Sequence, residues 1–315
     1  MTIAYIYHPD CLLHDMGEGH PECPARIEAI EDQLKASHLF DFVRHYEAPL
    51  ATVGQLARVH DKNYISRVLS YSKLEAYVDS ENPHAYLDPD TLIMPKTPQA
   101  ALRSAGAAVL ATDLVMTGKT KAAFCCVRPP GHHALRGESM GFCFFGNVAV
   151  GAAHAIAEYG VQRVAIVDFD VHHGNGTEDL VQNNPNILFC STFQHPFYPY
   201  CGTENVPSNV VNAPLAAGSD GEKFRAAVTD YWLPALHKFM PQIIFISAGF
   251  DAHYDDDMSS LRLVERDYAW VTQELLNVAD KYGEGRIISA LEGGYELHSL
   301  GRSVTAHLRV LMRMN

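Results

Sequence analysis

The residues best suited to chemistry lie in one short stretch from Asp168 to Thr177, which reads Asp-Phe-Asp-Val-His-His-Gly-Asn-Gly-Thr. Asp170 and His172 are two residues apart, so on an extended chain their side chains point to the same side. A carboxylate and an imidazole that converge are suitable ligands for a divalent metal ion. Asp168 faces the same side one step deeper, where it could orient a neighbouring group. A polar turn is the structural alternative, although four ionisable groups within six residues favour the metal site.

A predicted strand delivers this stretch to its place. Residues 163–169 form a short apolar run with β-branched side chains at alternate positions and with neither Gly nor Pro, which is typical of a buried strand. The abrupt change to polar residues marks the carboxyl end of that strand. In an open parallel sheet these ends share one edge, where ligands bind. We therefore expect the polar stretch to contribute to a functional site.

Three further predicted strands end in residues that could act in the same site. They are His132 and His133 after residues 122–127, Asp251 after residues 242–247, and Tyr295 after residues 286–291. Each has an ordinary structural alternative: a solvated turn for the two histidines, a helix N-cap for Asp251 and a rim position for Tyr295. Because all of them follow the same end of a predicted strand, we expect them to meet.

The segments between these strands alternate between helical and extended character. Strands are also predicted at residues 3–7 and 187–191, and helices at residues 25–36, 60–69, 99–116, 147–159, 219–239, 263–281 and 297–312. Ser219 and Glu222 have the spacing of a capping box at the start of their helix. Residues 79–98 are rich in Asp, Pro and Asn without a clean period, so we expect a long loop there. The alternation predicts an α/β fold, with a mostly parallel sheet between two layers of helices.

The length and composition of the chain predict a single domain that binds neither nucleic acid nor a membrane. The 315 residues contain no internal repeat, low-complexity segment or convincing linker, so we expect one domain over residues 1–315. The net charge of −13, without clusters of Lys or Arg, argues against nucleic-acid binding. No apolar run is long enough to span a bilayer, and the N-terminus lacks the features of a signal peptide. Seven scattered cysteines without a Cys-x-x-Cys pair predict free thiols and a cytoplasmic location.

A series of motifs runs along most of the chain. They are Arg-Pro-Pro-Gly-His132-His133, Gly141-Phe142-Cys143, the stretch from Asp168 to Thr177, Ser247-Ala-Gly-Phe-Asp251 and Leu291-Glu-Gly-Gly-Tyr295. In their order and spacing they resemble the histone deacetylase superfamily, which also includes bacterial acetylpolyamine amidohydrolases and other amidohydrolases. Asn175 and the Leu-Glu-Gly-Gly-Tyr motif make the chain more similar to the class II and bacterial branch. The resemblance implies the arginase/deacetylase fold, with an eight-stranded parallel sheet, and a single catalytic zinc ion.

The resemblance implies which residues bind metal ions. Zinc would be held by Asp170, His172 and Asp251, with positions left open for water and for a substrate carbonyl. A structural potassium ion would lie near Asp168, bound by backbone oxygens of Asp168, Asp170 and His172 together with Ser191. Of the potassium site, the sequence itself shows only Ser191 at a suitable position.

The resemblance also implies how the other polar residues would act. His133 would be the general base and acid, and Asn175 lies where a partner that orients His133 belongs. His132, held by Asp168, would be an electrostatic partner. Tyr295 would donate a hydrogen bond to the oxyanion that forms from the substrate carbonyl.

The substrate would enter through a narrow tunnel. Phe142, next to Gly141, and Tyr198 would line the tunnel around an extended acyl-amine chain, and Met258 would be a further wall residue. Phe197 is the neighbour of Tyr198 and could take its role. A glutamate at the position of Met258 would mark a dedicated polyamine gate in one branch of the family, so Met258 does not favour polyamines.

The loops expected around the tunnel mouth are acidic. Their carboxylates are Asp15, Glu18 and Glu22 in the first loop, Asp79, Glu81, Asp88 and Asp90 in the second, and Asp255, Asp256 and Asp257 in the third. In the family an acidic residue of the second loop grips the substrate, and Asp90 or Asp88 occupies the matching region. Clustered carboxylates attract cations, which predicts a preference for cationic acyl-amines. The alternative is a set of solvated loop acids in an acidic chain. Arg26 matches a family position near the inner pocket.

The predicted reaction is removal of an acetyl or related acyl group from an amine, with acetyl-lysine of a protein or peptide as the first candidate. An acetylpolyamine or another small amide would use the same groups. An arginase-like enzyme with two manganese ions would need further Asp and His ligands, which the segment after Ser247 does not provide. A non-catalytic binding protein is disfavoured because the set of metal ligands, histidines and tyrosine is complete. The sequence leaves the oligomeric state open, including a homo-oligomer.

Overall fold

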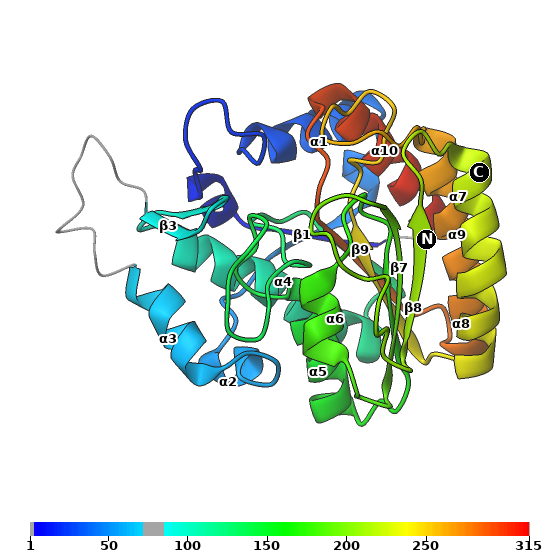
Figure 1. Cartoon of the computed structure of the whole chain (residues 1–315), viewed down its shortest axis with the longest axis horizontal. Helices are drawn as coiled ribbons and strands as arrows, with labels where there is room; N and C mark the ends of the chain where they lie inside the picture. Colours follow the sequence, from blue (N-terminus) through cyan, green and yellow to red (C-terminus); the bar gives the residue numbers. More distant parts are fainter. Residues whose placement is uncertain (1–2, 72–84, 315) are drawn as a thin grey trace.

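An eight-stranded sheet forms the centre of the molecule (Figure 1). The computed structural model describes residues 3–71 and 85–314. Neighbouring strands of the sheet are parallel throughout, in the order β2-β1-β5-β10-β9-β6-β7-β8. The strands are β1 (Ala4–Tyr7), β2 (Arg44–Glu47), β5 (Ala122–Cys125), β6 (Val164–Asp168), β7 (Ile187–Gln194), β8 (Val210–Leu215), β9 (Ile243–Ala248) and β10 (Ile287–Leu291). The predicted α/β class and the eight-stranded parallel sheet are confirmed.

The inner strands are buried because helices cover both of their faces. Every residue of β5, β6, β9 and β10 is buried, and these strands read as nearly continuous apolar runs. The sequence did not predict the two edge strands, β2 and β8. The first reads Arg-His-Tyr-Glu and is largely exposed, and the second contains Pro214, so neither forms an apolar run.

Two layers of helices enclose the sheet. The helices are α1 (Ala25–Ala36), α2 (Val53–Leu56), α3 (Lys62–Ser70), α4 (Thr97–Met116), α5 (Asn147–Tyr159), α6 (Asn175–Val181), α7 (Gly221–Ala227), α8 (Leu233–Phe239), α9 (Glu265–Tyr282) and α10 (Leu297–Leu311). Helix α4 packs on α5, and α10 packs on both α1 and α9. In Figure 1, α5 lies below the sheet and α1 and α10 lie above it. A Cβ at Gly151 of α5 would lie only 2.8 Å from the ring of Phe245 in β9, so this glycine lets the helix approach the sheet closely.

The predicted helix at residues 219–239 differs from the structure in two respects. Its predicted capping box of Ser219 and Glu222 does not form, because Asp220 caps the helix instead. The Asp220 side chain accepts hydrogen bonds from the backbone N–H groups of Glu222 and Lys223. A π-helical turn, Val228–Trp232, then separates α7 from α8. The helix therefore begins one residue later than its sequence pattern suggests, and it is not uniform.

The long loop predicted at residues 79–98 was also wrong for its described part, because a hairpin forms there. Residues 79–84 lie outside the described residues. Strands β3 (Ala85–Asp88) and β4 (Thr91–Ile93) pair antiparallel, and α4 begins within the same range. At the turn, the Asp88 carboxylate accepts a hydrogen bond of 2.9 Å from the Asp90 N–H. This is a turn that Asp and Pro favour, which explains why the composition looked like that of a loop.

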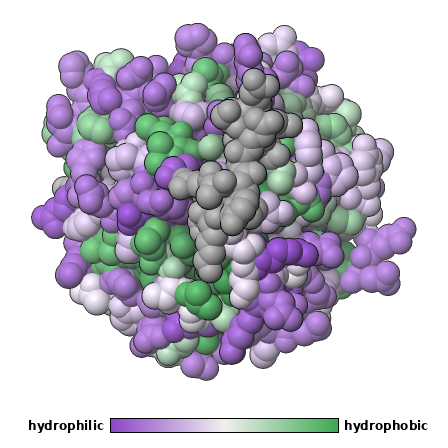
Figure 2. Space-filling model, turned by 90° about the vertical axis from the view of Figure 1, so that its left-hand side faces the viewer, coloured by the Kyte–Doolittle hydropathy of each residue, from purple (hydrophilic) through white to green (hydrophobic). Residues whose placement is uncertain are grey.

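The helices, the cysteines and one face of the molecule can be compared with what the composition predicted. None of the helices in the described ranges is both long and apolar enough to cross a membrane. All seven cysteines are free, as predicted. The side of the molecule that carries β3 and α3 is largely hydrophilic, with hydrophobic residues in separate spots (Figure 2).

A fully buried group of charges fixes the segment between β1 and α1. The two carboxylate oxygens of Glu22 accept hydrogen bonds of 2.7 and 2.6 Å from Arg128 and one of 3.2 Å from Arg26. Arg128 also donates to the carbonyl oxygens of Cys11 and His14. Burial alone would raise the pKa of Glu22, but Arg128 and His14 hold it well below its usual range. The carboxylate is therefore charged, and it is the anion that two buried guanidinium groups share.

We expect Glu22→Ala to destabilise the fold strongly, because it leaves Arg26 and Arg128 buried without their anion. Breaking a buried ion pair from one side costs about 3–5 kcal/mol of unfolding free energy. The measurement is chemical denaturation of the variant and the parent protein. Glu31→Ala is the control, since Glu31 pairs with Lys35 at the surface and should cost at most about 1 kcal/mol. Equal costs for the two substitutions would contradict this interpretation of the buried group.

Candidate active site

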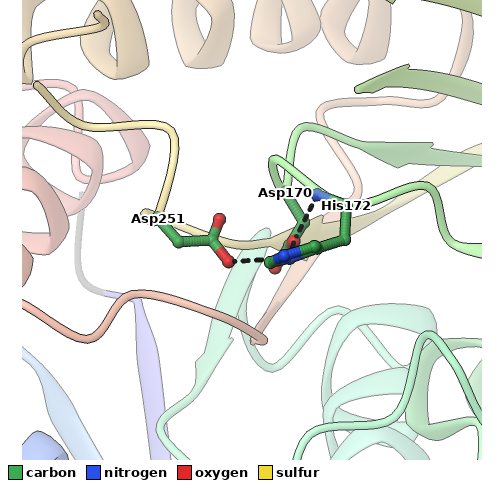
Figure 3. A group of neighbouring side chains, drawn as sticks. All are labelled: Asp170, His172 and Asp251. Carbon is green, nitrogen blue, oxygen red and sulfur yellow. Dashed lines mark hydrogen bonds and ion pairs between the residues drawn. The ribbon is translucent and has the colours of Figure 1, made fainter. Parts of the chain in front are cut away.

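The loops that follow β6 and β9 bring a possible metal-binding group together (Figure 3). The group consists of Asp170, His172 and Asp251, which are all buried and whose ligand atoms lie within 4.8 Å of one another. The Nδ1 atom of His172 is 3.1 Å from Asp170 Oδ1 and 3.2 Å from Asp251 Oδ2. Asp170 and His172 point to the same side, as their spacing in the sequence predicts.

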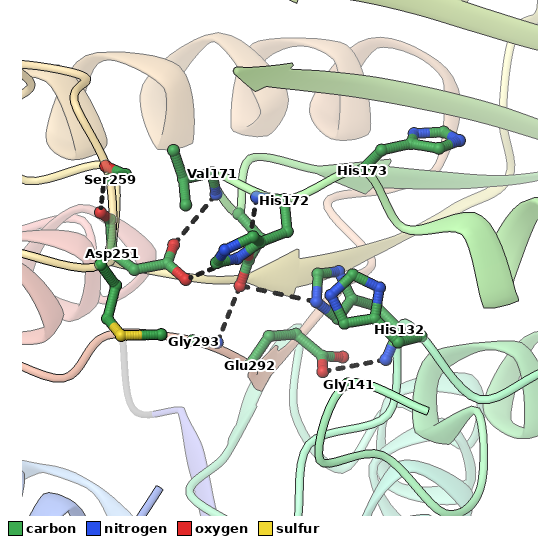
Figure 4. A network of polar contacts seen from close by, with 12 residues as sticks. His132, Gly141, Val171, His172, His173, Asp251, Ser259, Glu292 and Gly293 are labelled. Atoms are coloured by element: carbon green, nitrogen blue, oxygen red, sulfur yellow. Dashed lines mark hydrogen bonds and ion pairs between the residues drawn. The ribbon is translucent and has the colours of Figure 1, made fainter. Parts of the chain in front are cut away.

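The donors around this group suit a divalent cation. Asp251 Oδ1 accepts a hydrogen bond from the Val171 N–H, and Asp170 Oδ2 accepts one from the Gly293 N–H (Figure 4). Asp251 Oδ2, in contrast, is buried and accepts no hydrogen bond from any described residue. Burial and the nearby Asp170 carboxylate raise the pKa of Asp251 to about 6. Two buried carboxylates and one imidazole, with a carboxylate oxygen left over, form a set that fits a metal such as zinc.

Two histidines lie beside the metal-binding group and have different partners. They follow β5, and the centroids of their rings are 4.0 Å apart. His132 Nδ1 is 3.0 Å from the carboxylate of Asp168, whereas His133 Nδ1 is 2.7 Å from the amide oxygen of Asn175. The structure therefore brings together both of the pairs that the sequence analysis expected.

These partners push the two histidine pKa values apart. Burial alone would lower the pKa of His132, but the Asp170 and Asp168 carboxylates raise it well above the usual histidine range. Burial and the neighbouring His132 and His172 lower the pKa of His133 well below that range. A neighbouring pair of titratable groups with opposed pKa shifts is typical of sites that perform acid and base chemistry.

Tyr295 reaches the same site from the loop after β10. Its ring lies over the Arg26 guanidinium, whose central carbon is 4.8 Å from the ring centroid. The ring also meets Phe142 edge to face at a centroid distance of 6.2 Å. All four predicted strand ends thus converge, as a parallel sheet requires of strands that end at one edge.

A cavity of about 240 Å³ leads to these groups. It is lined by Asp90, His133, Gly141, Phe142, His172, Phe197, Tyr198, Met258 and Tyr295. Each residue that the sequence analysis assigned to the substrate is among them, and so is the alternative Phe197. Tyr198 meets His133 edge to face at 5.3 Å, and Phe197 stacks on His172 at 5.4 Å. Both aromatic neighbours therefore form the wall, and Tyr198 also meets His172 edge to face at 6.0 Å.

The hairpin β3–β4 fixes one side of the cavity, through a residue that the sequence analysis did not single out. Asp90 Oδ1 accepts a hydrogen bond of 3.1 Å from the Gly141 N–H, and the hydroxyl of Thr91 accepts one of 3.1 Å from the Phe142 N–H. Phe142 has a φ of +66°, a conformation that is rare for residues other than glycine. The hairpin therefore holds a strained part of the wall, and nothing in the sequence near Thr91 indicates this.

Glu292 is a second residue whose function the sequence analysis missed. Its carboxylate accepts a hydrogen bond of 3.1 Å from the His132 N–H (Figure 4). It accepts another of 2.6 Å from the Gly131 N–H, and so fixes the loop that carries the two histidines. Burial raises the pKa of Glu292 to about 7. A signal was present, since Glu292 is a charged residue directly after a buried strand.

Some acids predicted at the tunnel mouth lie elsewhere. Glu22 belongs to the buried charge group, and Asp256 is buried with its carboxylate on backbone N–H groups. Asp79 and Glu81 lie outside the described residues. Of the acids in these loops, Asp90 lines the cavity. Glu22 and Asp256 therefore do not supply the exposed negative charge that the sequence predicted for them.

The fold and the converging groups together define an enzyme of the arginase/deacetylase class. A solved structure, the crystal structure of the HDA15 HD domain, superposes on this chain with a TM-score of 0.91 and 32% sequence identity. The match covers 99% of this chain and 88% of the HDA15 chain. A family model described as the histone deacetylase domain matches residues 20–311. The chain therefore belongs to the histone deacetylase family, and it is a hydrolase.

Curated relatives agree with this assignment. A probable deacetylase from Archaeoglobus fulgidus is 33% identical over 305 residues, which cover 94% of this chain and 82% of that protein. The protein named polyamine deacetylase HDAC10 from Mus musculus is 35% identical over 336 residues, which cover 99% of this chain and 48% of that protein.

Removal of a single ligand should abolish metal binding. The parent protein and the variants are loaded with Zn²⁺ and then desalted. We expect His172→Ala and Asp251→Ala to lose most of the metal that the parent protein retains. Each substitution leaves two ligands, and a stable site needs at least three. The measurement is metal per chain by mass spectrometry. Asp168→Asn is the control and should retain much of the metal, since Asp168 contacts His132 instead. Full metal content in either alanine variant would refute the ligand assignment.

Proposed function

We propose that this chain is a zinc-dependent deacetylase that removes an acetyl or related acyl group from an amine, with acetyl-lysine of a protein or peptide as its substrate. The observation that carries the proposal is the position of the two histidines. Both lie beside the metal-binding group, and His133 also lines the cavity with aromatic walls. The same cavity suits the linear aliphatic stem of an acylated lysine, which can be enclosed without leaving a charge buried.

Zinc would be held by Asp170, His172 and Asp251. When bound, it would polarise the substrate carbonyl and lower the pKa of a water molecule. The Gly293 N–H supports Asp170, and the Val171 N–H supports Asp251, so both carboxylates are fixed before a metal arrives.

His133 would move the proton in the proposed reaction. Its Nδ1–H donates to the amide oxygen of Asn175, because the Asn175 nitrogen faces the sulfur of Met140. The Nε2 atom is then free to take a proton from the attacking water and to return it to the leaving amine. His132 has a carboxylate partner, Asp168, which favours the imidazolium form. A cation next to the base helps to stabilise negative charge on the reacting carbonyl group.

The cavity walls would hold the acyl-amine in reach of these groups. Phe142 and Tyr198 present aromatic surface, and Gly141 has a φ of +55° next to the His133 ring. A Cβ at Gly141 would lie 2.3 Å from His133 Cδ2, so only glycine allows this approach. Gly141 therefore brings the wall to within contact distance of the proposed base.

An acetylpolyamine is the second substrate candidate, because a mouse relative is named a polyamine deacetylase. Its cationic chain would pass Asp90 at the mouth. Met258, an apolar residue in the wall, offers no charge that would select a polyamine. A screen of acetyl-lysine peptides against acetylpolyamines, compared by kcat/KM, distinguishes the two classes.

Two rivals find little support. A ureohydrolase with two manganese ions needs a second cluster of ligands, and the described residues contain one group able to hold a metal. A non-catalytic binding protein would not need the separate partners of His132 and His133.

The potassium ion near Asp168 stays a prediction. Ser191 lies opposite Asp168 in the β6–β7 register, and its hydroxyl is 3.2 Å from His173 Nδ1. The seven free cysteines support the predicted cytoplasmic location.

Tyr295→Phe tests the proposed hydrogen bond to the oxyanion. Loss of one preorganised donor should lower kcat roughly 100- to 1,000-fold. Zinc content should change little, since the substitution leaves the metal ligands intact. The measurement is turnover of a simple acetyl-lysine substrate. Near-normal turnover would remove Tyr295 from the mechanism.

A charge preference follows from Asp90, whose carboxylate lines the cavity. Acetyl-lysine peptides with basic neighbours should have a higher kcat/KM than matched acidic peptides, and the preference should shrink at high salt. Asp90→Asn should weaken it, because the substitution removes the charge and keeps an oxygen for the Gly141 N–H. Asp41→Asn, an exposed position outside the cavity lining, is the control for net charge. Equal efficiencies at both salt concentrations would end this hypothesis.

A further inference from the structure

We propose that Asp256 is a positioning residue for catalysis: together with Arg26, it holds the loop that carries Tyr295, so that the phenol hydroxyl faces the substrate carbonyl. This inference rests on the role proposed above for Tyr295. Asp256 does not line the cavity and has no place in the metal-binding group. Its action would therefore pass through the backbone that it holds, above all that of Tyr295.

The contacts of Asp256 all go to the backbone. The side chain is buried, with 4% of the residue exposed. Its Oδ2 accepts hydrogen bonds of 2.6 Å from the Tyr295 N–H and 3.1 Å from the Glu296 N–H. Its Oδ1 accepts one of 3.0 Å from the Met258 N–H. Hydrogen bonds from N–H groups to a charged carboxylate are roughly twice as strong as neutral ones, so Asp256 is a firm anchor.

Arg26 holds the same loop by its carbonyl groups. The guanidinium donates to the carbonyl oxygen of Gly294 at 2.6 Å and to that of Glu292 at 2.5 Å. It also lies against the Tyr295 ring. An anion thus binds the N–H groups of residues 295 and 296, and a cation binds the carbonyl groups of residues 292 and 294. Together the two charges fix the backbone on both sides of Tyr295.

The loop needs such anchors because it cannot be stiffened by its own side chains. A Cβ at Gly293 would lie 2.1 Å from Asp251 Oδ2 and 2.6 Å from Asp170 Oδ2, so glycine is required for the approach to the metal-binding group. Gly294 has a φ of +119°, a conformation that other residues rarely adopt. Two consecutive glycines leave the backbone free to move, and Asp256 and Arg26 remove that freedom.

The loop that carries Asp256 also carries a proposed zinc ligand. Asp251 and Asp256 belong to the segment after β9, which also provides Met258 for the cavity wall. The segment therefore ties three parts to one another: a metal ligand, a wall residue and the proposed hydrogen-bond donor. A shift of about 1 Å in a group that acts on the transition state can cost on the order of 100-fold in rate.

The first experiment compares Asp256→Asn with the parent protein. The amide has one oxygen in place of two, so it must turn an N–H₂ group toward backbone N–H donors on one side. We expect kcat per active site to fall roughly 10- to 100-fold with little change in KM, because the substrate still binds the same walls. Active sites are counted by titration with a tight hydroxamate. Asp257→Asn is the matched control, since Asp257 is exposed in the same loop and should keep its kcat.

A double-mutant cycle separates positioning from general structural support. If Asp256 acts through the Tyr295 hydroxyl, Asp256→Asn should cost less than about threefold in a Tyr295→Phe background. A full additional loss in that background would overturn the inference. An unchanged kcat for Asp256→Asn, beside an impaired Tyr295→Phe, would overturn it as well and leave the proposed function standing. Normal turnover by Tyr295→Phe would instead refute the proposed role of Tyr295 itself.

Hydrogen exchange gives a readout that does not depend on activity. The backbone amides of Tyr295 and Glu296 donate to Asp256. The peptide that contains them should therefore exchange faster in Asp256→Asn than in the parent protein, and at the parent rate in Asp257→Asn. Equal exchange in both variants would contradict the anchor. If Asp256→Asn does not fold, Arg26→Lys replaces it in the double-mutant cycle with Tyr295→Phe. Lysine keeps the charge but cannot reach the carbonyl groups of both Glu292 and Gly294.

Discussion

The repulsion between two buried carboxylates is the constraint on which the rest of the site depends. Asp170 and Asp251 follow neighbouring strands, β6 and β9, and both side chains are almost completely buried. Like charges in a buried site are costly unless cations and hydrogen-bond donors surround them. The protein supplies the N–H groups of Val171 and Gly293 and the ring of His172. Glycines at 249 and 293 allow this approach, since a Cβ at either would lie within 2.1 Å of a carboxylate oxygen.

Outside this centre, buried charges alternate in sign. Glu22 pairs with Arg26 and with Arg128, and Arg26 holds the loop between Glu292 and Tyr295. Asp256 then holds the N–H groups at the other end of that loop. Each of these charges fixes a loop that carries a proposed catalytic residue or follows a strand end. The stability of the buried charges and the geometry of the reaction are therefore properties of one connected arrangement.

The sequence predicted the parts of the fold that depend on local pattern. Six strands were visible as apolar runs, and their polar ends indicated a shared site because parallel strands finish at one edge. The edge strands lacked that pattern, since exposed residues and Pro214 interrupt them. Contacts over long sequence distances were also hidden. Asp90 and Gly141 are 51 residues apart, and Asp256 and Tyr295 are 39 apart, so only the packed fold shows that they touch.

The hairpin that contacts Gly141 and Phe142 has a consequence for how the enzyme can change over evolutionary time. Asp90 lines the cavity, and its carboxylate also holds the backbone of Gly141. A substitution there that suits a new substrate also releases part of the wall beside the proposed base. Recognition and catalysis therefore cannot be tuned separately at this position. Variation is freer at Met258, whose side chain lines the cavity while its N–H, present in every residue but proline, makes the contact with Asp256.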